Sequence, residues 1–479
     1  MTRRTKIVII VGAVAALGIV SALWARSFLD RNRVPVEYAD IVEHFKYGSI
    51  GTEKRLGVPA PLFDLFPVMF ADLLPGDRPG KGYEKLGFLY EPGHKRPIGT
   101  TLRELPVPLV GLNCAACHTG TLRDKPGGER TLLFGGSANN FDSEGYLNFL
   151  LAIAQDPRFT TDKLLDGLKH QDPDFGLFDR VLYRFFVLPQ VEKAFKGFVT
   201  QYAWLKIRPP FGPGRVDTFN PYKVYHHLDM SHDDSIGSVD FPTIFNQKPR
   251  VGMNLHWDGN NNVVEERNIS AAIGAGAEPA TLDIPQMMRI RDWIMTLPAP
   301  AFPKDKIDAA KAQRGEAWWK AECADCHAFS GRRVGQVTPM AEIGTDAERE
   351  RSFTQELADK QNTLGTGYPW QLKHFRKTGG YANAPLDGVW LRSPYLHNGS
   401  VPTLRDLLSP PHQRPKQFYR AYDVFDYDSV GYVSSGPDAE KLGWKYDTTV
   451  RGNHNTGHTY GVNLAPEQKD ELIEYLKTL

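Results

Sequence analysis

Two short cysteine motifs carry the most specific chemistry in this sequence. One reads Asn-Cys-Ala-Ala-Cys-His and ends at His118, and the other reads Glu-Cys-Ala-Asp-Cys-His and ends at His327. In a C-x-x-C-H pattern the two thiols can add to the two vinyl groups of a haem, and the following histidine can bind the iron. The sequence therefore predicts two covalently bound haem c groups. Their attachment residues are Cys114, Cys117 and His118 for one, and Cys323, Cys326 and His327 for the other.

Other uses of the four cysteines fit the sequence less well. A zinc site would have to join two pairs that lie about 200 residues apart and each have a histidine of their own. A thioredoxin-type motif needs one pair in a βαβ setting, which the pattern does not indicate. Disulfides are common in exported proteins, but cysteines two residues apart seldom pair. Haem attachment explains the cysteines and the adjacent histidines together.

The bulk composition narrows the class of protein. A chain of 479 residues is too long for one compact core, so at least two domains are expected. The formal net charge of +1 argues against a nucleic-acid partner, because such binding depends on excess positive charge. The 44 glycines and 35 prolines predict a loop-rich structure.

The N-terminus predicts export. Residues 7–25 form an apolar run that is long enough to span a bilayer as a helix, and arginines and a lysine precede it. We expect residues 1–30 to hold an uncleaved transmembrane anchor, with the rest of the chain on the periplasmic side of a bacterial inner membrane. The alternative is a cleaved signal peptide, which would leave a soluble periplasmic protein.

Two similar helical segments mark the ends of two domains. Residues 284–297 and 464–479 both have helical apolar spacing, and both end in Thr-Leu. In cytochrome c domains a terminal helix packs across the helix that precedes the haem motif. Residues 298–303 are rich in proline and read as a stiff linker. We therefore predict one haem domain over residues 31–299 and a second over residues 300–479.

The predicted fold class is mainly α: two cytochrome c-type domains with long loop-rich insertions, preceded by an N-terminal transmembrane helix. Helices are expected over residues 36–47, 141–154 and 306–322. The aromatic-rich residues 178–204 exceed what a minimal cytochrome domain needs. We expect them to cover the haems, to form a partner surface, or to be decoration without a role.

Further segments carry a resemblance to a known family. They are Phe241–Asn246, Leu255–Gly259, Val264–Arg267 and Ser393–Leu404. Their motifs resemble those of the bacterial dihaem cytochrome c peroxidase superfamily, which includes MauG-type enzymes and the Rox-type rubber oxygenases. The long first domain and the Gly-rich residues 452–461 look most similar to the rubber-oxygenase branch.

The resemblance implies a division of labour between the two haems. The N-terminal haem would react with peroxide or dioxygen, and the C-terminal haem would pass electrons to it. Trp257 of the Trp-Asp-Gly segment would lie between them. Glu266 and Arg267 would be the catalytic residues on the reacting side, with Arg267 replacing a glutamine of the family pattern. Glu265 and Glu278 are nearby acids that we expect to be solvated charges as readily as catalytic groups.

The resemblance also bears on the remaining iron ligands. The peroxidases carry a removable histidine ligand before the first of these segments; here only His232 lies near, so the first haem is expected to be open. No methionine follows Met340, so the second haem needs another sixth ligand. A histidine is the natural choice, and we predict His458. The other candidates are His397, His412 and His454.

These observations favour a periplasmic dihaem oxidoreductase of the peroxidase type, dependent on iron. Its expected partners are hydrogen peroxide or dioxygen, a small redox protein or quinol-linked electron donor, and the membrane through the N-terminal helix. A calcium ion between the domains is a further expectation, for which the sequence names no ligands. The alternatives are a pure electron-transfer cytochrome and a dihaem oxygenase that acts on an organic substrate.

Overall fold

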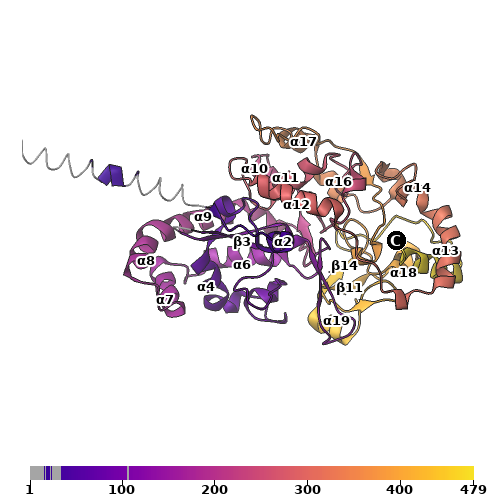
Figure 1. Cartoon of the computed structure of the whole chain (residues 1–479), viewed down its shortest axis with the longest axis horizontal. Helices are drawn as coiled ribbons and strands as arrows, with labels where there is room; N and C mark the ends of the chain where they lie inside the picture. Colours follow the sequence, from indigo (N-terminus) through magenta and orange to yellow (C-terminus); the bar gives the residue numbers. More distant parts are fainter. Residues whose placement is uncertain (1–15, 17, 22, 24–33, 105–106) are drawn as a thin grey trace, which may run out of the picture.

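The computed structural model describes residues 16, 18–21, 23, 34–104 and 107–479. In Figure 1 the N-terminal part of the chain, coloured indigo to magenta, lies at one end of the long axis, and the C-terminal part, orange to yellow, lies at the other. The C-terminal residue lies close to α13 and α18 in that view. The second haem motif, which ends in α14, lies toward the C-terminal end in this view.

Short helices and short strands alternate along the chain. Up to the second haem motif the helices are α2 (Ile41–Tyr47), α3 (Glu53–Leu56), α4 (Ala60–Met69), α5 (Cys114–Cys117), α6 (Ser143–Gln155), α7 (Thr161–Gln171), α8 (Leu177–Leu182), α9 (Leu188–Gln201), α10 (Asn220–Tyr225), α11 (Val264–Gly274), α12 (Ile284–Thr296) and α13 (Ala309–Glu322). They continue with α14 (Ala324–His327), α15 (Met340–Ile343), α16 (Glu348–Ser352), α17 (Gln355–Gln361), α18 (Leu404–Leu407), α19 (Pro437–Leu442) and α20 (Pro466–Leu476).

The strands form small antiparallel sheets. The largest sheet has the order β1-β3-β4-β2, and the other sheets are two-stranded. Its strands are β1 (Val34–Pro35), β2 (Val58–Pro59), β3 (Thr100–Glu104) and β4 (Leu109–Leu112). The others are β5 (Thr119–Leu122), β6 (Thr131–Phe134), β7 (Arg215–Asp217), β8 (Ser238–Asp240), β9 (Val337–Pro339), β10 (Gly380–Ala382), β11 (Gln417–Arg420), β12 (Phe425–Asp426), β13 (Gly431–Tyr432) and β14 (Trp444–Asp447).

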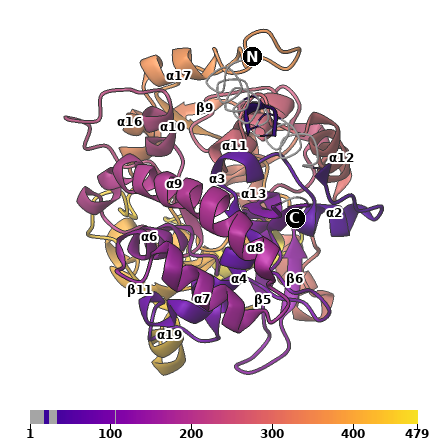
Figure 2. The ribbon, with the colours of Figure 1, turned by 90° about the vertical axis from the view of Figure 1, so that its left-hand side faces the viewer.

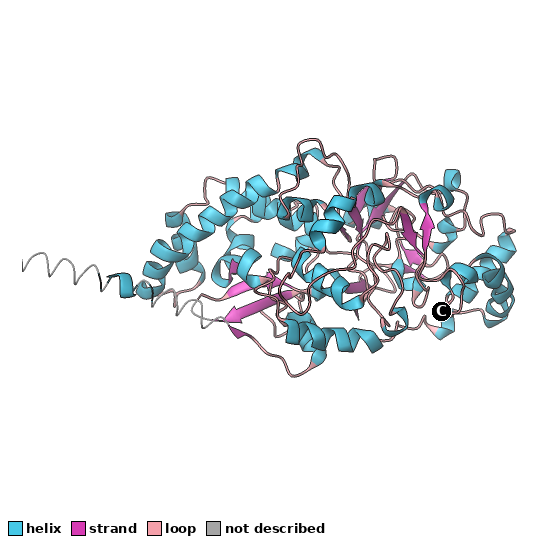
Figure 3. Ribbon diagram, turned by 90° about the horizontal axis from the view of Figure 1, so that it is seen from above, coloured by secondary structure: helices cyan, strands magenta, loops and turns pink. Residues whose placement is uncertain are grey.

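The predicted fold class needs correction. Within the described ranges the structure contains no helix that is long and apolar enough to cross a membrane, so the predicted N-terminal transmembrane helix is not supported. Most of the predicted span, residues 7–25, lies outside the described residues. The description "mainly α" holds only in part, because strands and long loops separate the helices (Figure 3). Frequent prolines and glycines end the helices early and favour these loops.

The first haem motif is held between the largest sheet and α2. Asn113 caps α5 by accepting a hydrogen bond from the Ala115 N–H. The amide of Asn113 also donates to the carbonyl oxygens of Phe45 and Gly48 at the end of α2. As expected for a terminal helix, α12 packs against α2. The predicted start of α2 was too early: Asp40 accepts from the next N–H groups and begins the helix at Ile41.

The second haem motif follows a pair of crossed helices. The C-terminal α20 packs along α13, which leads into Cys323, and this is the contact that the sequence predicted. A Cβ atom at Gly315 of α13 would lie 2.0 Å from the carbonyl oxygen of Glu471. Glycine therefore allows the two helices to approach this closely. Arg314 and Trp318 of α13 both donate to the carboxylate of Glu471 and fix the crossing.

The two parts of the chain are joined by polar contacts as well as by apolar packing. Residues 353–375 of the C-terminal part share an apolar core with α2, α11 and α12. Asp258, of the Trp-Asp-Gly segment, forms a buried ion pair with Arg349 of α16 at 2.8 Å. Asp423 accepts from Arg130 at 2.7 Å on the other side of the molecule. These contacts fix the orientation of one haem motif relative to the other.

The long insertion of the first part is helical. Helix α6 matches the prediction for residues 141–154 closely, and α7, α8 and α9 lie across the end of the molecule that Figure 2 shows. Three phenylalanines of the aromatic-rich segment point outward: Phe178, Phe185 and Phe186 have 77%, 64% and 58% of their surface exposed. Tyr183 and Trp204, in contrast, are buried in the core. The insertion thus presents an apolar outer surface.

Candidate haem sites and the residues between them

The first motif presents two thiols and one oriented imidazole. Cys114 and Cys117 are both unpaired, and Asn113 fixes the short helix α5 that carries them. Nδ1 of His118 lies 2.9 Å from the carbonyl oxygen of Pro242. A carbonyl oxygen can only accept, so Nδ1 carries the proton and Nε2 keeps the free lone pair that a metal ligand needs. Burial lowers the pKa of His118 to about 4, and the positive charge of Arg267 is a smaller cause in the same direction. The ring is therefore neutral at pH 7.

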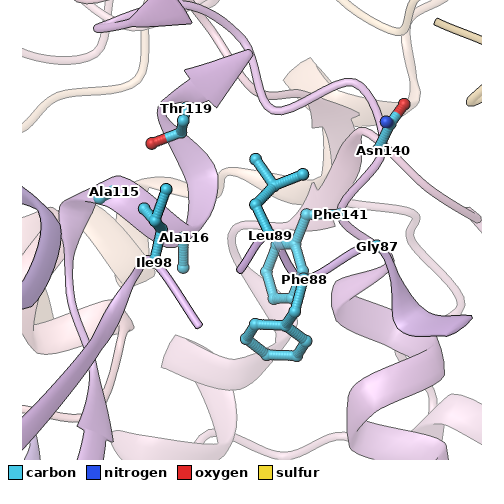
Figure 4. Close-up of a pocket in the computed structure, with 9 residues that line it drawn as sticks. All are labelled: Gly87, Phe88, Leu89, Ile98, Ala115, Ala116, Thr119, Asn140 and Phe141. Carbon is cyan, nitrogen blue, oxygen red and sulfur yellow. The ribbon is translucent and has the colours of Figure 1, made fainter. Parts of the chain in front are cut away.

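A small apolar pocket lies beside the first motif. Figure 4 shows Ala115 and Ala116 of α5 on one side of it and Phe88, Leu89 and Phe141 on the other. The remaining lining residues are Gly87, Ile98, Thr119 and Asn140. Most of the lining side chains are apolar, so part of the first motif borders an apolar environment.

The second motif has the same orientation chemistry. Cys323 and Cys326 are unpaired, and Nδ1 of His327 lies 2.7 Å from the carbonyl oxygen of Ala384. By the same reasoning as for His118, Nε2 is the free nitrogen. Burial lowers the pKa of His327, so this imidazole too is neutral at pH 7. Both motifs therefore hold their histidine by a backbone carbonyl from a distant loop.

His458 faces His327. The two ring centroids lie 6.2 Å apart, with 41° between the ring planes. Two metal–nitrogen bonds of about 2 Å, plus the distance of about 1 Å from each nitrogen to its ring centre, add up to roughly this separation. Burial lowers the pKa of His458 to about 3, with a further contribution from His327. His327 and His458 would hold the iron of a haem at this motif, so the second motif has residues that fit a haem.

The other candidate ligands of the second haem lie elsewhere. His397 is buried, and its Nε2 is 3.0 Å from the hydroxyl of Tyr381, against which the ring stacks. His412 and His454 are exposed. His232, the histidine considered for the first haem, is exposed as well. Of the predicted sixth ligands, the structure brings only His458 next to an attachment histidine.

Trp257 connects the segments that orient the two histidines. Its indole N–H donates to the carbonyl oxygen of Asp240 at 3.0 Å, and Asp240 is two residues from Pro242, which orients His118. The carbonyl oxygen of Trp257 accepts from the N–H of Ala382 at 2.8 Å, two residues before Ala384. We call these two hydrogen bonds the Trp257 bridge. It joins the two haem motifs by a short path of covalent and hydrogen bonds.

Glu266 is fully engaged in structural contacts. The buried carboxylate accepts from the N–H groups of Lys373 and His374, at 3.1 Å each, from Nδ1 of His374 at 2.6 Å and from the Asn261 amide at 3.0 Å. These four contacts leave little capacity for moving a proton. The neighbouring acids are also committed or exposed: Glu265 pairs with Arg291 at 3.1 Å.

Arg267 lies close to the first motif. Its guanidinium donates to the side chain of Asn268, and its charge acts on His118, Cys114 and His256. No carboxylate forms an ion pair with it in the part of the chain that the structure describes. Of the two residues predicted as catalytic on the reacting side, the structure thus places Arg267, and not the carboxylate of Glu266, in an electrostatic environment suited to a bound anion.

The residues that sequence reasoning missed act through their backbones. The carbonyl groups of Pro242 and Ala384 orient the two histidines, but any residue type has a carbonyl group, so no side-chain pattern marks them. Pro242 belongs to a segment that carried the family resemblance, which is the one signal that pointed to it. Ala384 lies in a loop without a distinctive motif.

Comparison with known proteins supports a cytochrome c assignment. Residues 380–420 match the family described as RoxA-like, cytochrome c-like. The matched segment contains Ala384, which orients His327, and continues through β11. A cytochrome c-like domain implies covalently bound haem c, in agreement with the unpaired cysteines and oriented histidines described above.

Two proteins of Sinorhizobium fredii are similar to this chain. The uncharacterized protein y4iM is 31% identical over 284 residues, which cover 50% of this chain and 64% of that protein. The uncharacterized protein y4iJ is 26% identical over 500 residues, which cover 83% of this chain and 81% of that protein. The chain thus spans a little under two thirds of the first relative. Together with the geometry, the match of residues 380–420 to a RoxA-like, cytochrome c-like domain supports a haem-containing oxidoreductase with covalently bound haem c.

Proposed function

We propose that the chain is a dihaem c-type cytochrome oxidoreductase in which peroxide or dioxygen reacts at the N-terminal haem and the C-terminal haem relays electrons to it. The observation that carries the proposal is the Trp257 bridge, because it links the two histidine-orienting loops through one residue, by its indole N–H on one side and its backbone carbonyl on the other. A protein that only stores electrons at separate haems would not need such a link.

The two sites differ in the way that this division of labour requires. At the second motif, His327 and His458 can hold an iron from both sides, which suits repeated electron transfer without a change of ligands. At the first motif, the described residues place no second imidazole ring within contact distance of His118. When bound, the haem groups supply the redox chemistry itself, and an iron with a free position can take an oxygen-containing ligand.

The protein's own contribution is to orient the ligands, exclude water and provide charge. Pro242 and Ala384 keep His118 and His327 in the tautomer that binds iron. Arg267 supplies a buried positive charge beside the first motif, where charge-assisted hydrogen bonding is strong. We give Glu266 no proton-transfer role, because its oxygens already accept four hydrogen bonds.

We propose that the protein works in the bacterial periplasm. The support is the attachment chemistry: bacteria join haem to C-x-x-C-H motifs after export from the cytoplasm. The electron donor would then be a small redox protein or a quinol-linked carrier that reaches the end of the molecule near the second motif.

A second candidate function is oxygenation of an apolar organic substrate. The observation that favours it is the outward-facing apolar surface of Phe178, Phe185 and Phe186, which soluble proteins rarely expose without a partner. The similarity to the RoxA-like family is compatible with either candidate.

Rapid mixing of the reduced holoprotein with hydrogen peroxide, and separately with dioxygen-saturated buffer, tests the proposal. Oxidation of the C-terminal haem should follow reaction at the N-terminal haem, and Trp257→Phe should slow the second phase and not the first. An absence of any reaction with either oxidant would leave an electron-transfer cytochrome. Product formation from an added apolar alkene would favour the oxygenase.

A further inference from the structure

Three arginines lie near the two haem motifs, and two of them share one carboxylate. Arg250 and Arg392 both contact the side chain of Asp387, and Arg392 also donates to the Asp387 carbonyl oxygen at 2.7 Å. Asn246 donates to the second oxygen of Asp387 at 3.1 Å. Arg250 acts electrostatically on both Arg392 and Arg267, so it lies within electrostatic range of both. We call Arg250, Arg267 and Arg392 the arginine cluster.

The ends of the cluster reach the two motifs. Arg267 acts on the charge of His118 and of Cys114, which belong to the first motif. Arg392 acts on the charge of His327, which belongs to the second. Arg250, in the middle, lies 5.6 Å from the ring of Phe329, just past the second motif. Each attachment site thus has a guanidinium group of the cluster within electrostatic range.

The cluster carries more positive charge than its protein partners balance. The cluster has three guanidinium groups, and Asp387, which pairs with two of them, is the one carboxylate that pairs with the cluster among the described residues. This leaves an excess of two positive charges. Among the residues that the structure describes, Arg267 has only the neutral Asn268 side chain as a hydrogen-bond acceptor, and Nε of Arg392 is buried without a partner. Burial lowers the pKa of both arginines to about 10. Buried cations are costly unless anions pair with them, so the cluster is incomplete without further negative charge.

The chemistry of the missing anion follows from the donors. Planar guanidinium groups prefer carboxylates, which they bind through two parallel hydrogen bonds. A haem carries two carboxylate side chains on the edge opposite its vinyl groups. With a haem attached at each motif, up to four carboxylates would be available near a cluster that lacks two negative charges.

We propose that the arginine cluster binds the propionate groups of both haems, with Arg267 serving the first, Arg392 the second and Arg250 both. This inference rests on the dihaem part of the proposed function and not on the reaction at the first haem. Arg267 then acts through the cofactor's carboxylates and does not itself contact a bound oxidant. Because Arg250 is shared, the charge state of one haem is felt at the other.

Resonance Raman spectroscopy and redox titration of the purified full-chain holoprotein test the inference. Arg267→Gln should shift the propionate-bending bands of the first haem, and Arg392→Gln those of the second. Each should lower the midpoint potential of its own haem, because removing a nearby positive charge favours the oxidised form. Arg250→Gln should lower both potentials. Arg392→Lys, which keeps the charge, should restore most of the potential and not the bands.

Arg332→Gln is the matched control, because that arginine is also near the second motif but is exposed and pairs with Asp325. It should change neither the bands nor the potentials. Unchanged propionate bands in all three cluster variants, with haem still attached, would overturn the inference. A wild-type protein with fewer than two haems by mass would overturn the dihaem proposal instead, so the two failures are distinguishable. Loss of oxidant reactivity alone, with shifted bands, would support the inference and contradict only the proposed reaction.

Discussion

The two haem motifs are held in the same way and surrounded differently. In both, a backbone carbonyl from a distant loop fixes the proton on Nδ1 of the histidine, at 2.9 Å for His118 and 2.7 Å for His327. His327 faces a second imidazole, whereas His118 lies near an apolar pocket and the charge of Arg267. One attachment motif can therefore serve electron transfer or chemistry, and the residues opposite the histidine decide which.

Although their surroundings differ, the two haem motifs are connected through the protein. The Trp257 bridge and the arginine cluster both connect the two motifs, one through backbone carbonyls and the other through charge. The buried ion pair of Asp258 and Arg349 holds the same region together. The residues around the two histidines thus differ, while the Trp257 bridge and the ion pair of Asp258 and Arg349 connect the two parts of the chain.

Removing the second imidazole should erase the difference between the sites. In His458→Ala the second haem should lose its low-spin spectrum completely, and both haems should then bind cyanide. Electron paramagnetic resonance of the ferric protein measures this. His412→Ala, at an exposed histidine, is the control and should leave the spectrum unchanged. A second haem that stays low-spin in His458→Ala would show that another residue is the ligand.

Weakening the connection should separate the sites kinetically. Trp257→Phe removes the indole N–H that donates to Asp240. We expect electron transfer between the haems to slow by about tenfold or more, equivalent to about 1.4 kcal/mol of activation free energy. Flash photolysis of the half-reduced protein measures the rate. Trp318→Phe also loses an indole hydrogen bond, to Glu471, but lies outside the path. Equal slowing in both variants would contradict the bridge.

Breaking the buried ion pair should loosen the region between the sites. Asp258→Asn leaves Arg349 buried without its carboxylate, which costs about 3–5 kcal/mol of stability. Chemical denaturation of the holoprotein measures the loss. Asp470→Asn, which breaks the exposed pair with Arg405, should cost about 0–1 kcal/mol. Similar losses for the two variants would mean that the buried pair does not support this region.

The smallest expected effect is that of substituting Glu266. Glu266→Gln weakens the contacts to Lys373, His374 and Asn261 and should destabilise the protein by about 1–3 kcal/mol. The rate of reaction with peroxide should stay the same. Glu265→Gln, at a partly exposed pair with Arg291, should change neither quantity. A large fall in the rate, with stability preserved, would restore a catalytic role to Glu266.

Local sequence patterns predicted the haem-attachment residues. Residues that only the fold brings together could not be predicted in this way. The C-x-x-C-H motifs identify six residues without any knowledge of the fold. The choice of His458 needed the family resemblance, because nothing local in the sequence distinguishes it from His454. The residues that contact its backbone, Ile343 and Arg414, are far away in the sequence. Ala384 and the arginine cluster were missed, since a carbonyl group and scattered arginines have no sequence signature.

The fold was predicted where helices have strong local signals. Helices α6, α13 and α20 were expected within a few residues, and the crossing of α13 and α20 is present. The start of α2 was misplaced, because Pro35 suggested an early start whereas it pairs in β1 and Asp40 caps the helix. The transmembrane helix was inferred from hydropathy alone, and the described residues do not support it.

The central claim is that one haem is open and the other is closed by His327 and His458. Titration of the ferric holoprotein with cyanide, followed by electron paramagnetic resonance, tests it most directly. We predict one high-spin haem that converts on adding cyanide, beside one low-spin bis-histidine haem that does not respond. Two low-spin haems that both ignore cyanide, in the ferric and the half-reduced protein, would contradict the account.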